Sequence, residues 1–550
     1  MPTSCYQAIP AVLEHVLVEE PISVLDVGVG FGKYGLLLRE SLDVGAARYR
    51  PDEWRVQIDG VEAYPDYRNP VYDHVYNKVY FGDIRQVIDT LGTYDVVLAI
   101  DVLEHFTKEE GHLLLNKLLE HARKAVVIST PLYPAPQSDY RGNAFEAHKS
   151  RWHVLDVVHM DATYQLVPTA DGGAQVIKIY PAVENANNVH ELDKWWCVNA
   201  NVQRRPLRIS YLLPHQRLTG GLKLLLRQAS ELQRRGHEIW VFYKGTSERA
   251  VPDWAEGSFA NQIVIRPGET WDPYVRGSDL VVAGWIDQLL QLQTSDIPVL
   301  YWEQGSEWLF GDSVGQNPHV LRRYLRACYS QPYLLSAVSS TVQAILEHRF
   351  SRLVPVIPNG IDTTAFHPRK EDRSSSIPVI MLVGNPELWF KGFDVAFAVL
   401  ERLWKRGYRF RVLWVAPTPP ADRPTPFDVF VVVNPQQDEL PEWYREADLL
   451  LFTSWYEGFG MPPLEAMATG LPVVSTSCGG VKDYAIHGEN ALLAEPGDVE
   501  QLAKHVATLL TDEVARRQLG VQARATAMRF DWTRIGDMVE DYFYKAAFCP

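Results

Sequence analysis

Short apolar runs alternate with helix-length amphipathic segments along almost the whole chain, in three successive sets. The first set consists of ISVLDV, VQIDGV, DVVLAI and AVVIST, and it closes with two runs on either side of the turn signal DGG at 171–173. The second extends from RISYLL at 208–213 to VPVI at 354–357, and the third from VIMLVG at 379–384 to PVVST at 472–476. Apolar runs separated by helices are typical of parallel sheets covered on both faces. The pattern therefore predicts three α/β domains, the first ending in an antiparallel hairpin.

Two polar stretches interrupt this alternation. One is ENANNVHELDKWWCVNANVQRRP, and the other is HPRKEDRSSSIP at 367–378, which is charged, rich in serine and bounded by prolines. Such stretches are typical of linkers between domains. The predicted organisation is a first domain at 1–182, a linker at 183–206, a second domain at 207–370, and a third domain at 371–550 whose last helix packs back on the second.

Composition and charge limit which cellular compartment and which binding partners we expect for this protein. The formal net charge is −15, and an acidic surface repels phosphate backbones, so we expect no nucleic-acid partner. The five cysteines are scattered without a C-x-x-C pair, which favours a reducing compartment over a disulfide framework. The N-terminus lacks the basic-then-apolar order of a signal peptide, and no run approaches the ~18 apolar residues of a membrane span. We expect a cytoplasmic protein with at most weak contact at the inner membrane face.

A glycine-rich turn follows the first predicted strand, in VLDVGVGFGKYGLLL at 24–38. Glycines at a strand-to-helix turn allow close backbone approach of a ligand, and the helix N-terminus behind them favours electronegative groups. The turn alone is weak evidence, because dinucleotide-binding folds share it. Acidic residues after three further strands strengthen it, since a carboxylate can accept hydrogen bonds from ligand hydroxyls. These acids are Glu62, Asp83 and Asp101.

Residues 1–180 thereby resemble the class I S-adenosylmethionine (SAM)-dependent methyltransferases, whose fold the terminal hairpin also fits. The resemblance implies SAM as cofactor. It also implies that Asp26, Gly28, Gly30 and Gly32 contact the methionine part of SAM and that Glu62 binds the ribose hydroxyls. Asp83 and Ile84 would contact the adenine, and Asp101 would lie beside the amino-acid end. No N-P-P-Y-like motif follows the fourth strand, which favours an oxygen acceptor. His105 and His148 are candidate bases, because histidine titrates near neutral pH.

Three motifs in the later sets place glycine or positive charge near strand ends. They are the glycine pair Gly220–Gly221 that opens a helix, PNGID at 358–362, and VGNPELWFKGFD at 383–394, which contains Lys391. A glycine turn at a helix N-terminus accepts phosphate groups. A lysine can stabilise the negative charge that grows on a leaving diphosphate.

The fourth motif, YEGFGMPPLEAMATGLPVVST at 456–476, has a glutamate on each side of a turn rich in glycine and proline. Glu457 precedes the turn and can accept hydrogen bonds from sugar hydroxyls. Glu465 lies one turn into a helix predicted to start near Pro463, from which it can hold a ribose diol. Before that helix, the backbone N–H groups predicted to face a sugar and its diphosphate belong to Gly458, Phe459 and Gly460.

Over residues 206–550, the four motifs together resemble the retaining glycosyltransferases of the two-domain GT-B kind, close to the family-four (group 1) enzymes. The resemblance implies a nucleotide-diphosphate sugar as donor, a glycan or lipid-linked acceptor, and transfer of a hexose or deoxyhexose. It makes Lys391 and Glu457 the catalytic candidates. The implied donor site is Gly220, Gly221, Lys391, Glu457, Gly458, Phe459, Gly460 and Glu465.

The sequence departs from that family at two places. Asn385 stands where the family often has an arginine, and YWEQGSEW at 301–308 stands where it often has a histidine. Glu303 or Gln304 is therefore the candidate for contact with the donor sugar. No D-x-D pair occurs, which metal-dependent glycosyltransferases use to hold the diphosphate, so we expect no metal.

These features predict an α/β protein of three Rossmann-like domains, a class I methyltransferase fold followed by a two-domain GT-B glycosyltransferase. The predicted function is bifunctional, in polysaccharide or glycolipid biosynthesis: retaining glycosyl transfer, and SAM-dependent methylation of a glycan hydroxyl. The alternative is a glycosyltransferase with a non-catalytic, methyltransferase-like docking domain. Sugar-nucleotide epimerases share the two-domain fold, and a phosphorylase would need a pyridoxal-binding lysine, for which the sequence has no motif.

Overall fold

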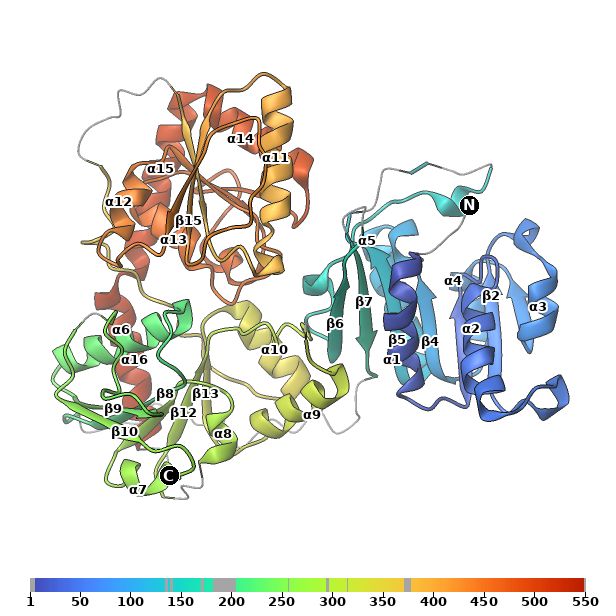
Figure 1. Cartoon of the computed structure of the whole chain (residues 1–550), viewed down its shortest axis with the longest axis horizontal. Helices are drawn as coiled ribbons and strands as arrows, with labels where there is room; N and C mark the ends of the chain where they lie inside the picture. The colour runs from blue at the N-terminus through green and yellow to red at the C-terminus, as the bar shows by residue number, and fades with distance from the viewer. Residues whose placement is uncertain are drawn as a thin grey trace. The chain divides into compact units, whose positions relative to one another are not determined.

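A computed structural model describes residues 5–133, 137–138, 142–169, 173–181, 204–255, 257–292, 296–313, 315–369 and 377–548. These form two compact units (Figure 1). The first comprises Met1–Ala186 with Phe310–Arg323, and the second comprises Asn187–Leu309 with Tyr324–Pro550. The centres of both predicted linkers and most of the DGG turn lie outside the described residues.

A seven-stranded sheet forms the first unit, in the order β3-β2-β1-β4-β5-β7-β6. The strands from β3 to β5 are parallel. β7 runs antiparallel to both of its neighbours, so the predicted hairpin is present as β6–β7. The strands are β1 (Ser23–Val27), β2 (Gln57–Glu62), β3 (Lys78–Phe81), β4 (Tyr94–Ile100), β5 (Ala122–Pro131), β6 (Ala162–Val167) and β7 (Ala174–Ile179).

Helices connect the parallel strands, and their apolar faces join the core of the first unit. The central strands β1 and β4 are buried along their whole length, which explains why their sequences are mainly apolar. β3, which was not predicted, lies at the edge of the sheet and has no buried residue. The helices are α1 (Ile9–Leu17), α2 (Lys33–Leu42), α3 (Pro70–Val75), α4 (Ile84–Val87) and α5 (Lys108–Glu120).

One segment predicted within the second domain groups with the first unit instead, Phe310–Arg323. The backbone of Tyr164, on β6, donates to Gly311 O at 2.7 Å and accepts from Ser313 N at 3.1 Å. Arg322 forms an ion pair with Asp161 beside the same strand. The segment therefore extends the open edge of β6, a pairing that apolar periodicity does not reveal.

Two six-stranded parallel sheets form the second unit. The N-terminal sheet has the order β10-β9-β8-β11-β12-β13 and the C-terminal sheet the order β16-β15-β14-β17-β18-β19. The first contains β8 (Arg208–Leu213), β9 (Glu238–Lys244), β10 (Asn261–Ile265), β11 (Leu280–Ala283), β12 (Val299–Glu303) and β13 (Leu334–Ala337). The second contains β14 (Val379–Val383), β15 (Arg411–Ala416), β16 (Val429–Val433), β17 (Leu449–Phe452), β18 (Val473–Thr476) and β19 (Leu492–Ala494).

The prediction of a strand at 354–357 was wrong, because only Val356 pairs there, in an isolated bridge with Ala337. β19, with three residues, was not predicted. The helices around the N-terminal sheet of the second unit are α6 (Gly220–Arg234), α7 (Asp272–Val275), α8 (Gln288–Gln291), α9 (Pro318–Tyr329) and α10 (Ser340–Phe350). Those of the C-terminal part are α11 (Phe393–Lys405), α12 (Leu440–Arg445), α13 (Met461–Ala468), α14 (Val499–Thr511), α15 (Glu513–Ala527) and α16 (Trp532–Ala547).

The last helix, α16, packs against α6 of the N-terminal half of the second unit (Figure 1). Arg235, which follows α6, forms ion pairs with Asp537 at 2.7 Å and Glu540 at 3.1 Å, both on α16. The backbone of Ile361 also forms a bridge with Asp531, at the start of α16. The chain thus crosses between the two halves at both 361 and 531, which ties them together.

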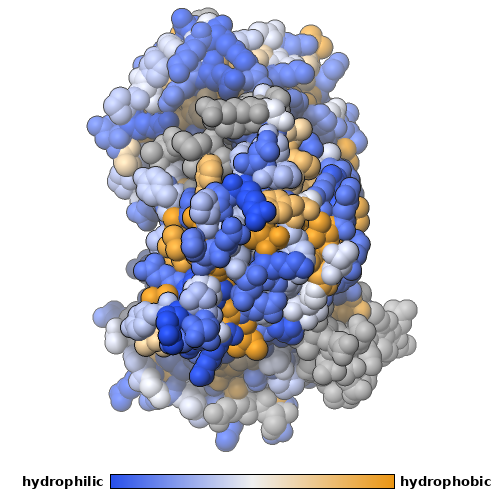
Figure 2. All heavy atoms as spheres, turned by 90° about the vertical axis from the view of Figure 1, so that its right-hand side faces the viewer, coloured by the Kyte–Doolittle hydropathy of each residue, from blue (hydrophilic) through white to orange (hydrophobic). Residues whose placement is uncertain are grey.

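The surface mixes polar and apolar side chains. Figure 2 shows one face on which hydrophilic residues are interspersed with smaller hydrophobic groups. The leucines of the basic helix α6, Leu222, Leu224, Leu225 and Leu226, are buried and serve as core. Within the described residues, no helix combines the length and the apolar character that crossing a membrane requires.

Candidate functional sites

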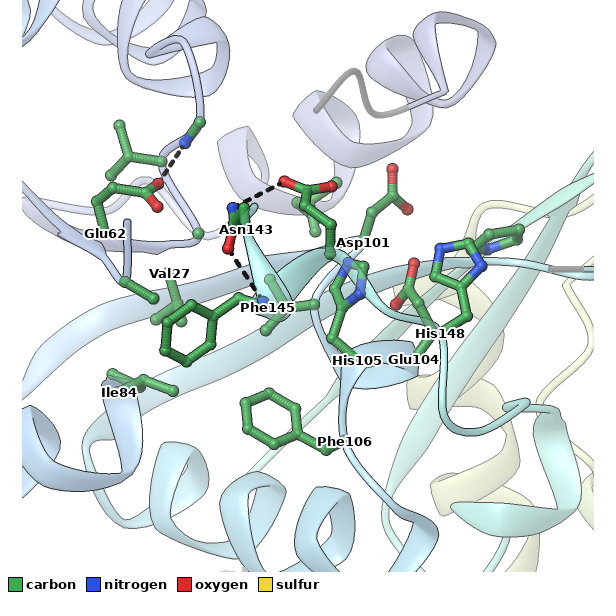
Figure 3. Close-up of a pocket in the computed structure, with 18 of the residues that line it drawn as sticks. Val27, Glu62, Ile84, Asp101, Glu104, His105, Phe106, Asn143, Phe145 and His148 are labelled. Atoms are coloured by element: carbon green, nitrogen blue, oxygen red, sulfur yellow. Dashed lines mark hydrogen bonds between the residues drawn. The ribbon is translucent and has the colours of Figure 1, made fainter. Parts of the chain in front are cut away.

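A cavity of about 900 Å³ lies in the first unit, at the carboxyl ends of the parallel strands. Its wall includes Val27 and Gly28 from the end of β1, Glu62 from the end of β2, and Asp101 after β4 (Figure 3). In open α/β sheets, ligands bind outside the carboxyl ends of the strands at the point where the strand order reverses, which here lies between β1 and β4. The cavity is therefore the candidate ligand site of the first unit.

The glycine turn is fixed to the wall of this cavity by Glu62 (Figure 3). Gly30 N donates to Glu62 Oε2 at 2.8 Å, and Tyr64 N donates to Oε1 at 2.8 Å. Burial raises the pKa of Glu62 above its usual range, and these two backbone donors oppose the shift. A carboxylate oxygen has two lone pairs, so each oxygen retains capacity for a ligand hydroxyl.

Asp26 and Gly32, which the resemblance places at the methionine part of SAM, are not among the residues that line the cavity. The Tyr76 hydroxyl donates to Asp26 Oδ2 at 2.6 Å, and the carboxyl is almost fully buried. Gly32 caps α2 with φ of +84°, and a Cβ there would lie 2.8 Å from Val71. Both residues therefore stabilise the glycine turn from outside the cavity.

Replacing Asp26 with asparagine is expected to stabilise the first unit at neutral pH. Burial raises the pKa of Asp26 from 3.8 to about 6. The folded state therefore disfavours the ionised form, and stability falls as pH rises from about 4 to about 6. Each pKa unit corresponds to about 1.4 kcal/mol, so we expect a gain of about 3 kcal/mol at pH 7.5. Asparagine can still accept from Tyr76.

Denaturant unfolding of the Asp26→Asn protein at pH 7.5 and at pH 5 measures this gain, which should shrink at the lower pH. The exposed Asp52→Asn change is the control and should leave the unfolding free energy within about 0.5 kcal/mol of wild type. A gain that is equal at both pH values would contradict the assignment of a buried, disfavoured carboxylate.

The remaining acids predicted for the first unit do line the cavity. Asp83 caps α4 and accepts hydrogen bonds from the Arg85 guanidinium, which lowers its pKa. Ile84 lies beside it on the cavity wall. Asp101 adopts φ of +53° and accepts from Cys5 N at 3.3 Å, and burial raises its pKa to about 6. Three strand ends thus bring Glu62, Asp83 and Asp101 to one cavity.

The candidate bases His105 and His148 also line the cavity, and their ring centroids lie 5.2 Å apart. Burial lowers the pKa of His105, which favours the neutral imidazole. Glu104 lies between Asp101 and His105 in the sequence and was not predicted to be functional. It is 1% exposed and also lines the cavity. Its position after β4, in DVLEHF, was the available signal.

In the second unit, the two predicted catalytic residues contact each other. Lys391 Nζ lies 2.7 Å from Glu457 Oε1, and Ser454 Oγ donates to the same oxygen at 2.7 Å. Both charged side chains are largely buried, with 18% and 11% exposure. Lys391 ends a short 3-10 turn, and the following Gly392 packs where a Cβ would lie 2.1 Å from Thr453 O. Lys391 and Gly392 therefore pack closely against the backbone of Thr453, the residue that follows β17.

The two halves of the second unit meet at glycines. A Cβ on Gly458 would lie 1.9 Å from Gln304 O, and one on Gly305 would lie 2.5 Å from Gly458 Cα. Gln304 Nε2 donates to Gly221 O at 3.0 Å. Gln304 therefore connects the glycine pair of α6 with the glycine turn before α13.

The alternative that Glu303 contacts the donor sugar conflicts with its environment. Its side chain is 1% exposed, and its carboxylate accepts from Gly305 N at 2.7 Å and from the Tyr329 hydroxyl at 2.5 Å. Glu303 therefore shapes the turn that carries Gln304 and Gly305. Asn385 likewise acts locally, since its Oδ1 accepts from Glu387 N at 3.0 Å.

The glycine turn leads into α13, which begins at Met461, two residues earlier than predicted. Gly460 caps it with φ of +85°, a conformation that favours glycine. The Phe459 ring is buried against Tyr484, with centroids 5.4 Å apart. Its side chain is therefore structural, and only its backbone N–H can serve a ligand.

A second cavity, of about 510 Å³, is enclosed by α6, the PNGID segment, α12 and α13. Glu465 lies on its wall, where the Tyr444 hydroxyl donates to Oε2 at 2.7 Å, and Gly220 lies opposite on α6. Arg227 and Asp362 line it as an ion pair of 2.8 Å. Lys391, Glu457 and Gly458 are not among its lining residues. Asp362 belongs to the predicted PNGID motif but was not named as a site residue, and Arg227 and Trp532 were missed because nothing in their local sequence marks them.

Comparison with known proteins decides the class of the C-terminal part. Residues 377–512 match the family model described as glycosyl transferases group 1. The C-terminal part of the chain is a group 1 glycosyltransferase domain. The motif that contains Glu457 and Glu465, and the segment that contains Lys391, both lie within it.

Relatives of this glycosyltransferase domain act on different substrates. The D-inositol 3-phosphate glycosyltransferase of Xylanimonas cellulosilytica is 29% identical over 220 residues, which cover 35% of the chain and 51% of the relative. The sulfoquinovosyl transferase of Arabidopsis thaliana is 29% identical over 34% of the chain and 39% of its own length. The chain thus spans about half or less of these two relatives. A Nocardia farcinica D-inositol 3-phosphate glycosyltransferase is 25% identical over 63% of the chain and 91% of its own length.

The fold of the wider region agrees with this domain. Sucrose-phosphate synthase from Thermosynechococcus elongatus superposes with a TM-score of 0.52 at 19% identity, covering 62% of the chain and 98% of that structure. A Rickettsia africae glycosyltransferase superposes with a TM-score of 0.50 at 15% identity. The second unit therefore has the GT-B fold of two Rossmann-like parallel sheets around the glycosyltransferase domain.

Proposed function

We propose that the second unit transfers a sugar from a nucleotide-diphosphate donor to a glycan or lipid-linked acceptor, with retention of anomeric configuration. The observation that carries this proposal is the 2.7 Å pair of Lys391 and Glu457 beside the glycine turn of a group 1 glycosyltransferase domain. Residues 66 apart in the chain converge there, at the start of α13.

The chemistry follows from charge. Breaking the glycosidic bond places negative charge on the diphosphate, which Lys391 and the N–H groups before α13 can stabilise. Glu457 holds the Lys391 ammonium in place and can accept from a donor-sugar hydroxyl. Glu465, held by Tyr444, can accept the two hydroxyls of a ribose. The named relatives differ in sugar and acceptor, so the proposal specifies the reaction class.

A binding screen of nucleotide diphosphates and nucleotide sugars, followed by product analysis with acceptor glycans, tests this proposal. We expect micromolar to millimolar binding of one nucleotide class and a glycosylated product with retained configuration. An epimerised nucleotide sugar without transfer to any acceptor would favour the epimerase alternative. The absence of binding by every nucleotide tested would overturn the proposal.

We further propose that the first unit binds SAM and transfers its methyl group to a hydroxyl, as the other activity of a bifunctional enzyme. The 900 Å³ cavity supports this, because the glycine turn, Glu62, Asp83, Ile84 and Asp101 all line it. The terminal β6–β7 hairpin also fits the resemblance to class I methyltransferases. His105 is the candidate base, since its neutral form can accept the hydroxyl proton.

Replacing Glu62 with alanine is expected to abolish SAM binding and to leave sugar transfer unchanged. The carboxylate can bind the ribose hydroxyls and also holds the turn through Gly30 N. A hydrogen bond to a charged group contributes about 1.5–3 kcal/mol, so Kd should rise at least about 10-fold. Calorimetry with SAM measures this, together with glycosyl transfer assays on the same protein.

Two further variants make that result specific. Glu62→Gln retains one acceptor for the turn, and it should weaken SAM binding while the protein melts as wild type does. Glu40→Ala, at an exposed position on α2, should bind SAM normally. If the wild-type protein binds no SAM, the first unit is instead a docking module, as in the alternative reading. If Glu62→Ala abolishes sugar transfer in a folded protein, the two activities are coupled.

A further inference from the structure

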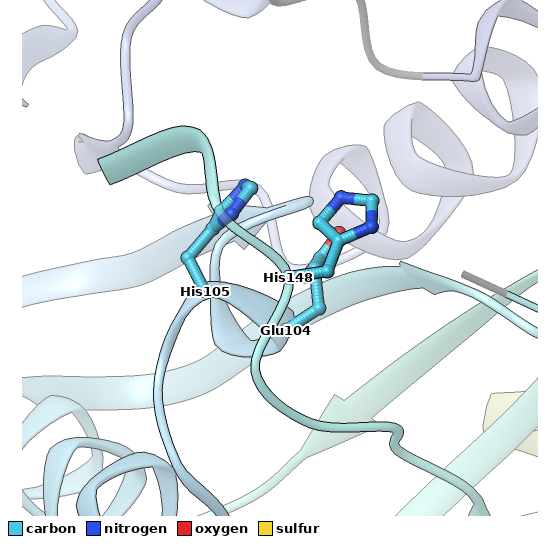
Figure 4. A group of neighbouring side chains, drawn as sticks. All are labelled: Glu104, His105 and His148. Carbon is cyan, nitrogen blue, oxygen red and sulfur yellow. The ribbon is translucent and has the colours of Figure 1, made fainter. Parts of the chain in front are cut away.

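Three side chains with metal-binding chemistry gather on the wall of the cavity in the first unit. They are Glu104, His105 and His148 (Figure 4). One ligand atom from each lies within 4.8 Å of the others. Zinc and similar cations bind carboxylate oxygen and imidazole nitrogen at about 2.0–2.2 Å. Small side-chain rotations would therefore bring all three ligand atoms around one cation.

The backbone holds these side chains together although the chain separates them. Glu104 and His105 belong to the 3-10 turn Leu103–His105 that follows β4, and His148 belongs to a loop more than 40 residues later. Lys149 N and Ser150 N both donate to Glu104 O, at 2.7 and 3.1 Å. The buried indole of Trp152 donates to Leu103 O at 3.2 Å. These hydrogen bonds hold the loop that contains His148 directly against the turn that contains Glu104 and His105.

The electrostatics of Glu104 favour a cation. The side chain is 1% exposed, and its buried Oε2 has no hydrogen-bond partner among the described residues. A buried carboxylate without a partner is strongly destabilising, so it must either bind a proton or contact a positive charge. Asp101, three residues before Glu104, interacts electrostatically with the positive charge of Lys33.

The histidines are suited to the same role. A metal binds the neutral imidazole, and the ring of His105 lies beside that of His148, with centroids 5.2 Å apart. His105 Nδ1 lies 3.3 Å from Ala147 O, an interaction that can fix the tautomer and leave Nε2 for a ligand. Two histidines and one carboxylate are a ligand set that divalent transition metals bind while keeping open positions.

We propose that Glu104, His105 and His148 bind a divalent transition-metal cation on the wall of the cavity in the first unit. The site was not anticipated from the sequence, which predicted no metal. The three side chains line the same cavity as Asp101 and Glu62 (Figure 3). There the cation could bind oxygen atoms of a polar ligand, such as neighbouring hydroxyls of a sugar. The cation site itself does not depend on methyl transfer, and where the cation is bound His105 is a ligand and not a base, because neither of its ring nitrogens is then left to accept a proton.

Metal binding to the tag-free, full-length protein tests the proposal, with Mn²⁺ as probe. Calorimetry and the loss of the free Mn²⁺ electron paramagnetic resonance signal should give one site per chain. Changes to outer-shell partners of metal ligands weaken affinity about 10–100-fold, so Glu104→Gln and His148→Ala should weaken it at least that much. The matched controls Glu109→Gln and His74→Ala, both at exposed positions of the first unit, should bind as wild type does.

The outcomes separate this proposal from the one on SAM. Circular dichroism and melting curves of each variant establish that it folds. A wild-type protein that takes up no Mn²⁺ or Zn²⁺, or variants that bind as tightly as wild type, would overturn the cation site. SAM calorimetry on the same proteins reports the other activity independently. Uptake of the cation by a protein that fails to bind SAM would uphold the cation site alone.

Discussion

Replacing Lys391 with alanine is expected to lower kcat for sugar transfer about 10²–10³-fold while KM for the donor changes little. The ammonium lies 2.7 Å from Glu457 and is largely buried, so its charge is poorly screened by solvent. It acts on negative charge that develops as the donor breaks down, and a preorganised charge of this kind contributes to the transition state. Steady-state kinetics with the donor identified by the nucleotide screen measures the effect.

Two comparisons make this result specific. Glu465→Ala removes a proposed ribose contact and should raise KM more than it lowers kcat, since that contact is already made in the ground state, before the glycosidic bond breaks. Lys405→Ala, at the exposed end of α11, should leave both constants unchanged. Wild-type kinetics in both Lys391→Ala and Glu465→Ala would show that the donor lies elsewhere.

Gly458→Ala is expected to reduce transfer at least about 100-fold and to lower the melting temperature of the second unit. The new Cβ would lie 1.9 Å from Gln304 O and 3.0 Å from Gly305 Cα, which are backbone atoms that cannot rotate away. Overpacking typically destabilises by about 1–3 kcal/mol, or a few degrees in a domain of this size. The displaced turn would also move its N–H groups and the adjacent Glu457 away from the donor.

Differential scanning calorimetry and the transfer assay measure both effects in the same protein. Gly92→Ala is the control, because a Cβ at Gly92 meets nothing within 4 Å. If the two halves can separate, activity should fall with little change in melting temperature. Normal activity together with a normal melting curve would contradict the close contact between Gly458 and the turn that carries Gln304.

Apolar periodicity alone determined most of the strand content. Central strands such as β4 and β17 are buried along their length, so their sequences are mainly apolar. Two strands escaped detection. β3 has no buried residue, and β19 has only three residues. The apolar run at 354–357 was instead predicted as a strand that the structure does not contain, since only Val356 pairs there, with Ala337 of β13.

Local glycine chemistry was also readable from the sequence. The turns after β1 and before α13 need positive φ values, which glycine adopts without strain, as at Gly28 and Gly460. Their function depended on more distant partners. Gly458 is required by its contact with Gln304, a residue 154 positions earlier that no local pattern marks.

Tertiary structure decided which polar residues face a ligand. Asp26 precedes the glycine turn by sequence, yet it points to Tyr76, because strand residues alternate between the two faces of a sheet. Glu104 resembles any surface acid in its motif and became a candidate metal ligand only because the loop before Trp152 buries it. The sequence by itself determined the sheets, the turns and the glycosyltransferase motif. The pairing of Lys391 with Glu457 and the grouping of Glu104 with two histidines required the fold, since burial and long-range contact set the charge of a side chain and its neighbours.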